Sequence, residues 1–173
     1  MSHRVSETVA TTYQQILPTV LGYLEKGRAH YEEIGEDVND AVDLRLIEDM
    51  QPLHFQMVSV VHHSMNALTS AQTGDAGPPD FSLALDYAGL TAHVQSALDA
   101  VNTADLDAIE ARVNEPVTFR MGKTEMPFTA SNFLLSFSLP NFYFHATTGY
   151  DLLRAKGVKL GKMDFLGKMR MGA

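Results

Sequence analysis

The residues from 134 to 154, LLSFSLPNFYFHATTGYDLLR, decide the fold of this chain. A helix turns by about 100° per residue, and on such a helix four polar residues share one strip in the middle of the apolar arc. These residues are Ser138, Asn141, His145 and Thr148. A helix buries its apolar arc, so their side chains are expected to point inward, where each needs a hydrogen-bond partner. The strip is therefore the predicted site of this protein.

Pro140 lies inside the predicted helix, one residue before Asn141. A proline removes one backbone hydrogen bond and clashes with the carbonyl four residues earlier, here that of Ser136, at a cost of about 3 kcal/mol. We expect a kink at this point. A kink would leave a carbonyl near the polar strip, which suits a small cavity, or aromatic packing could simply accommodate the bend.

The composition indicates one folded domain covering residues 1–173, because 45% of the residues are hydrophobic and 20% are charged. The net charge of −8 disfavours a nucleic-acid partner, since phosphate binding needs a basic surface. The absence of cysteine excludes disulfides and thiolate chemistry. The N-terminus has no apolar core of signal-peptide type, and no run approaches the roughly 18 apolar residues of a membrane helix. A soluble, cytoplasmic protein without a membrane partner is predicted.

Apolar residues at helical spacing predict three helices before the one that contains the strip. The first begins after Ser6 and the second covers about residues 46–68. An acidic surface connection at 35–42 separates them. A loop at 70–80, rich in glycine and proline, precedes a third helix that starts near Leu83.

A β-hairpin is predicted between the third and fourth helices. The residues from 117 to 128 alternate between apolar and polar around a turn at Gly122 and Lys123. Thr129 can then cap the fourth helix, and the C-terminal residues 155–173 are expected to lie extended across the helices. The predicted fold class is all-α, an antiparallel four-helix bundle with a small β-hairpin before the fourth helix.

Three histidines lie in the second predicted helix, and their angular positions differ. His54 is at the edge of the apolar arc, whereas His62 and His63 fall well outside it. We therefore expect His54 rather than His62 to face inward. A solvated or singly hydrogen-bonded histidine is the alternative for all three, and it is the preferred interpretation for His63.

Three segments of the chain resemble the signatures of a known protein family. They are DLRLIEDMQPL (43–53), LPNFYFHATTGYDLLR (139–154) and GVKLGKMDFLG (157–167). The family is an uncharacterised bacterial one that is placed with the DinB and YfiT-like four-helix bundles. The resemblance spans nearly the whole chain. It implies the bundle fold and a homodimer, and it implies no particular activity.

The wider superfamily implies a candidate metal site. Its members often hold zinc or nickel with one histidine from helix two and an H-x3-H pair in helix four, and some are thiol-dependent transferases or hydrolases. Here His145 matches the second histidine of the pair, and Asn141 replaces the first. His54 is the candidate from helix two because its angular position predicts that it faces inward. An amide is a weaker zinc ligand than imidazole. The candidate metal residues are His54, Asn141 and His145.

Three functions remain open at this point. The first is a small-ligand-binding module with a polar pocket on helix four, in which Asn141 and His145 hydrogen-bond the ligand. The second is a metal-dependent transferase or hydrolase that uses the reduced histidine site with a zinc or nickel ion. The third is a structural or dimerisation protein whose polar strip is a satisfied buried network.

Overall fold

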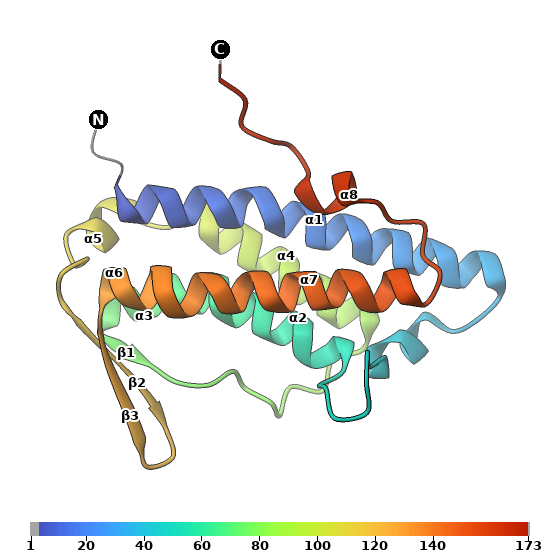
Figure 1. Ribbon diagram of the computed structural model, residues 1–173, viewed down its shortest axis with the longest axis horizontal. Helices are drawn as coiled ribbons and strands as arrows, with labels where there is room; N and C mark the ends of the chain where they lie inside the picture. Colours follow the sequence, from blue (N-terminus) through green and yellow to red (C-terminus); the bar gives the residue numbers. More distant parts are fainter. Residues whose placement is uncertain (1–3, 173) are drawn as a thin grey trace.

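The computed structural model describes residues 4–172, and it is mostly helical with one small sheet (Figure 1). Residues 1–3, which the prediction for the N-terminus includes, lie outside this part. The long helical segments are α1 (Val5–Ile34), α2 (Leu53–Val61) continuing through the π-helical turn η2 (His62–Asn66) into α3 (Ala67–Thr73), α4 (Tyr87–Asn102), and the π-helical turn η3 (Phe133–Ser138) continuing into α7 (Leu139–Ala155). Shorter helices are η1 (Val38–Asp43), α5 (Leu106–Glu110), α6 (Ala130–Asn132) and α8 (Lys162–Leu166).

The long segments pack side by side around a shared apolar core. Helix α1 contacts α4 and α7, and α2 contacts both of these helices as well. In Figure 1, α1 and α7 run in one direction, and α2 and α4 run in the other. Because α2 and α4 are parallel, residues 77–86 must return along the length of the molecule, and we call them the crossover segment. No helix in the described chain combines the length and hydropathy of a bilayer-spanning segment.

The small sheet has the strand order β1 (Asp75–Ala76), β2 (Pro116–Met121) and β3 (Thr124–Thr129). Strands β2 and β3 are antiparallel and are joined at Gly122 and Lys123, which confirms the predicted hairpin. Strand β1 pairs in parallel with β2. It lies in a region that was predicted to be loop, because a two-residue strand paired with a distant segment leaves no local pattern.

Several predicted helix ends are confirmed or corrected. Thr129 caps the last helical segment, since its hydroxyl accepts the amide of Asn132. The second helix begins at Leu53 and not at 46, because Pro52 disfavours helical backbone in the residue before it. The third helix begins at Tyr87 and not near Leu83. The carboxylate of Asp86 caps it by accepting the amide of Gly89 at 2.7 Å.

Pro140 follows the π-helical turn η3, in which the amide of Leu139 donates to the carbonyl of Leu134, five residues earlier. A π-helical turn changes the hydrogen-bond spacing locally, at the place where the sequence predicts a bend. The C-terminal tail is only partly extended. It forms α8 on α1, where Lys26 pairs with Asp164 at 2.6 Å.

Three long helices meet at Gly149 of α7. The hydroxyl of Tyr23 in α1 donates to the carbonyl of Ala146 at 3.2 Å and lies 3.8 Å from the sulfur of Met57 in α2. A Cβ atom at Gly149 would lie 2.4 Å from the Met57 methyl carbon and 2.8 Å from the Tyr23 hydroxyl. A larger residue here would force the Met57 methyl group and the Tyr23 hydroxyl to shift.

Replacing Gly149 with alanine should lower the free energy of unfolding by about 1–3 kcal/mol, because the added methyl overpacks the junction. The matched control is Gly22→Ala on α1, where an added Cβ meets nothing within 4 Å. That change should be neutral or stabilise by up to about 1 kcal/mol, because alanine favours helix. Urea unfolding monitored by circular dichroism measures both. Equal effects of the two variants would contradict the close approach at Gly149.

Candidate functional site

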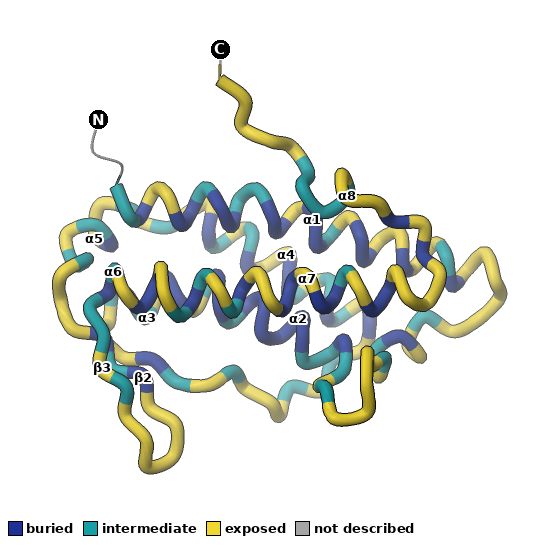
Figure 2. Tube along the Cα trace, viewed as in Figure 1, coloured by how far each residue is buried: buried dark blue, intermediate teal, exposed yellow. Residues whose placement is uncertain are grey.

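Helix α2 is buried on almost every side. The consecutive residues from Gln56 to Val61 are all buried, and together they point in every direction around the helix (Figure 2). A helix without a solvent-facing side must satisfy its polar side chains inside the protein. Gln56, at 1% exposure, is the polar residue of α2 that reaches toward α7.

Gln56 connects the start of α2 with His145 of α7. Its Nε2 donates to the carbonyl of Gln51 at 2.9 Å, so its Oε1 is the atom that faces the histidine. His145 Nδ1 lies 2.8 Å from this oxygen and must carry the hydrogen, because the oxygen can only accept. His145 is 8% exposed, which confirms its predicted burial. Its Nε2 is then the unprotonated ring nitrogen, a hydrogen-bond acceptor.

His63, and not His54, lies beside His145. The two rings are parallel, with centroids 5.7 Å apart and 7° between their planes, and His63 is only 5% exposed. The preferred interpretation of His63 as a solvated histidine was therefore wrong. His63 follows Gln56 by seven residues, about two helical turns, so both point toward α7. An argument from the apolar arc fails on a helix that is buried all round.

A backbone irregularity joins the two π-helical turns. In η2 the amide of Ala67 donates to the carbonyl of His62, five residues earlier, and so bypasses the carbonyl of His63. Ser138, at the end of η3, donates its hydroxyl to that carbonyl at 2.9 Å. The hydroxyl of Tyr13 from α1 lies 3.4 Å from the same serine oxygen. The inward position of Ser138 is thus explained by the backbone of η2.

The remaining residues of the polar strip, Asn141 and Thr148, donate hydrogen bonds to backbone carbonyls of their own helical segment. Asn141 Nδ2 donates to the carbonyl of Phe137 at 2.7 Å, next to the proline that brings no N–H of its own. The hydroxyl of Thr148 donates to the carbonyl of Phe144 at 2.8 Å. Of the four strip residues, Ser138 and His145 have hydrogen bonds to side chains of other helices, Ser138 to Tyr13 of α1 and His145 to Gln56 of α2.

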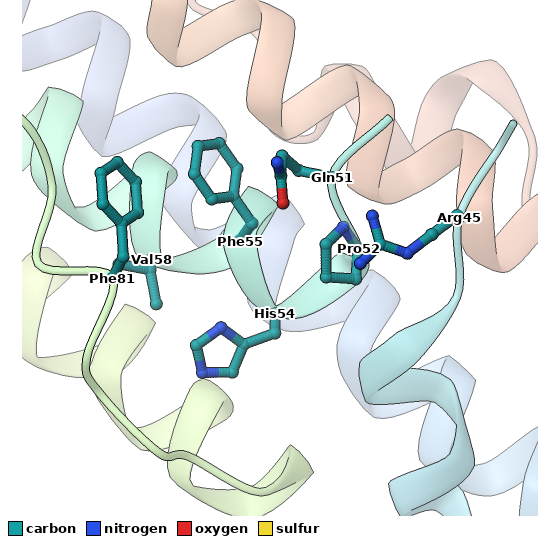
Figure 3. Close-up of a pocket in the computed structure, with 7 residues that line it drawn as sticks. All are labelled: Arg45, Gln51, Pro52, His54, Phe55, Val58 and Phe81. Atoms are coloured by element: carbon teal, nitrogen blue, oxygen red, sulfur yellow. The ribbon is translucent and has the colours of Figure 1, made fainter. Parts of the chain in front are cut away.

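The structure does not bring His54 to Asn141 and His145. His54 is two residues from Gln56, about 200° around α2, and Figure 3 shows its ring pointing away from Phe55 and Gln51. Among residues 4–172, no three His, Cys, Asp or Glu side chains are grouped to hold a metal ion. The donors present do not fit the zinc or nickel ion that the superfamily implies.

His54 instead lines a pocket at the start of α2, with a volume of about 400 Å³ (Figure 3). The lining residues are Arg45, Gln51, Pro52, His54, Phe55, Val58 and Phe81. Phe81 belongs to the crossover segment and stacks on Phe55, with ring centroids 5.2 Å apart and 7° between the planes. The rings of Phe55 and His145 also meet edge-on, with centroids 5.7 Å apart. The pocket therefore shares a wall with the buried histidine pair.

Burial keeps both histidines of the pair neutral. It lowers the pKa of His145 to about 4 and the pKa of His63 to about 3. The neighbouring His62 ring adds a smaller effect in the same direction for each. Loss of hydration disfavours the charged imidazolium. No carboxylate in this cluster offsets that loss. At neutral pH the pair can accept or donate hydrogen bonds but carries no charge.

Acidification should destabilise the protein. A histidine in the unfolded chain takes up a proton near pH 6.5, whereas His145 and His63 resist protonation until about pH 4 and 3. The unfolded state therefore binds more protons in this window, and stability falls as the pH falls from about 6.5 toward 4. The loss should be on the order of a few kcal/mol.

Urea unfolding at a series of pH values measures this loss. His63→Phe keeps a ring against His145 and should make the pH dependence shallower. His30→Gln, on α1 outside the cluster, is the control and should leave the wild-type dependence unchanged. A wild-type stability that stays constant across the window would show that the fold does not keep the pair neutral.

Comparison with known proteins supports the fold. The crystal structure of a DinB family member protein from Shewanella denitrificans is similar, with a TM-score of 0.78 and 23% sequence identity over 95% of this chain and 92% of that chain. The fold is accordingly DinB-like. No curated protein matches the sequence. The sequence model of a family described as "Domain of unknown function (DUF1993)" matches residues 6–166, and the chain therefore belongs to this DinB-like DUF1993 family.

Proposed function

We propose that this protein is a small-ligand-binding module whose ligand occupies the pocket at the start of α2. The framework is the four long helical segments, which we interpret as a bundle of DinB-like type in which α1 packs antiparallel to α4 and α2 packs antiparallel to α7. The observation that carries the proposal is the pocket itself, in which polar side chains meet an aromatic wall. Its volume of about 400 Å³ falls in the range of small-molecule sites.

The chemical character of the lining supports binding of a small organic molecule. Phe55, Phe81 and Val58 offer apolar and aromatic surface, and Pro52 adds a rigid ring. Arg45 and the other polar residues can orient a ligand by hydrogen bonds. Sites of this kind gain affinity from apolar burial and specificity from a few polar groups.

The pocket wall is held in place by the buried cluster behind it. The carbonyl of Gln51 accepts from Gln56, which in turn accepts from His145. Phe55 packs edge-on against His145 and stacks in parallel on Phe81. A rigid wall lowers the entropy lost on binding. The proposal thus moves the pocket from helix four to α2 and assigns His145 a supporting role.

Replacing Phe81 with alanine should weaken ligand binding at least several-fold, because it removes half of the aromatic stack. A library of rigid fragments, followed through amide chemical shifts in ¹H–¹⁵N spectra, provides the ligands. The control is Met121→Ala, which removes a large apolar side chain of similar exposure at the hairpin. A library that shifts no amide of Phe55, Val58 or Phe81 would refute the proposal.

We also propose that the protein forms a homodimer. Exposed apolar side chains on η3 and α7, those of Leu135, Tyr143 and Phe144, support this. Light scattering should then give a mass near twice the 19.0 kDa of one chain. Phe144→Glu should shift the mass toward the monomer, whereas Met163→Glu, on α8, should not. A monomeric mass for the wild type over a wide concentration range would contradict the dimer.

A further inference from the structure

We propose that the ligand of this pocket carries a carboxylate on an aromatic body, with Arg45 binding the carboxylate and Phe81 the ring. This inference rests on the proposed function and names the ligand class for the same site. It follows from three features of the lining: its charge, its aromatic stack, and the positions of Arg45 and Phe81 relative to each other.

The lining is basic in a protein whose net charge is −8. Its seven residues include Arg45 and His54 and no carboxylate. Glu48 and Asp49 follow Arg45 on the same segment, but neither lines the pocket. Within residues 4–172, no ion pair involves Arg45. An anionic group on the ligand would provide the charge partner that Arg45 lacks in the described chain.

The guanidinium of Arg45 is oriented but not saturated. Its Nη1 donates to the carbonyl of Met50, which ties the side chain to its own loop. A guanidinium has five N–H donors in a planar fork, and two parallel donors match the two oxygens of a carboxylate. Arg45 can therefore bind a carboxylate through two hydrogen bonds while it keeps its bond to Met50.

The aromatic stack has one open end. Phe55 and Phe81 stack in parallel, and Phe55 also contacts the buried His145 ring. Phe81, in contrast, is 58% exposed, an unusual state for a phenylalanine in a lining position. A flat ligand ring can pack on Phe81 and remove this apolar surface from water. Aliphatic ligands would bury less of the flat ring surface.

The two recognition groups are separated. Figure 3 places Phe81 and Arg45 at opposite ends of the lining, with Phe55 and Pro52 between them. A ligand that reaches both must be elongated, with its acidic group at one end and its ring at the other. A single bicyclic ring with a carboxylate substituent has this shape, and its volume is well within the pocket.

Three probes separate the parts of this inference: 2-naphthoate, its neutral isostere 2-naphthamide, and inorganic phosphate. Titrations followed by ¹H–¹⁵N spectra of the full chain give the affinities. Naphthoate should bind the wild type at least about tenfold more tightly than the amide, because hydrogen bonds between ions are the stronger ones. Added salt should reduce this preference, since Arg45 is exposed.

Arg45→Gln should lower naphthoate affinity by about tenfold or more and leave naphthamide affinity unchanged. The matched control is Arg28→Gln, which removes an exposed arginine of α1 that lies outside the pocket. It should change neither affinity. Phosphate should shift the amides near Arg45 only weakly, because it offers no ring to Phe81.

The possible results also distinguish this inference from the proposed function. Equal binding of naphthoate and naphthamide to the wild type would overturn the assignment of a carboxylate and leave the pocket as a ligand site. Phosphate binding as tight as that of naphthoate would overturn the aromatic part. A failure of the entire fragment library to shift the pocket amides would refute the proposed function itself.

Discussion

The burial of α2 on nearly all sides is the constraint on which the site depends. Most surface helices keep a polar face in water, but α2 lies against α4 and α7 and is buried all round from Gln56 to Val61. A polar residue on it must find its partner inside the protein or destabilise the fold. Gln56 meets this requirement by using both ends of its amide, one on Gln51 and one on His145. The orientation and tautomer of His145 are consequences of this arrangement.

The two π-helical turns are linked by a hydrogen bond. A π-helical turn leaves a backbone carbonyl outside the regular hydrogen-bond ladder, and a buried carbonyl without a partner is costly. In η2 this carbonyl belongs to His63, and Ser138 at the end of η3 supplies the hydrogen bond. A serine at the end of one irregular turn therefore satisfies the carbonyl bypassed in the other, and this contact helps to set the position of His63 along α7 beside His145.

The sequence predicts the local features well because their causes are local. The turn at Gly122 and Lys123, the cap at Thr129 and the inward strip of α7 all follow from residues within a few positions. The sequence also resembles the family that the comparison identifies. Strand β1 could not be predicted in this way, because its partner is more than 40 residues away.

The histidines of α2 show the limit of angular arguments most clearly. Such an argument assumes that each helix has an apolar inside and a polar outside, and α2 is buried on almost every side from Gln56 to Val61. It therefore favoured His54 over His62 as the inward histidine and preferred a solvated or singly hydrogen-bonded state for His63. Spacing alone held a better signal, since Gln56 and His63 are seven residues apart and point the same way. The π-helical turns gave no signal beyond the presence of Pro140.

The crossover segment, residues 77–86, is fixed at both ends. Strand β1 pairs with β2 just before it, and Tyr87 just after it donates its amide to the side chain of Asn39 at 3.1 Å. Phe81 is therefore held over the pocket by a tether whose conformational entropy is already lost when the chain folds. Binding at the proposed site would not have to order this segment again. In Figure 1, β1 lies at the opposite end of the molecule from the start of α2, so a strand of two residues would contribute to affinity at the proposed ligand site without touching it.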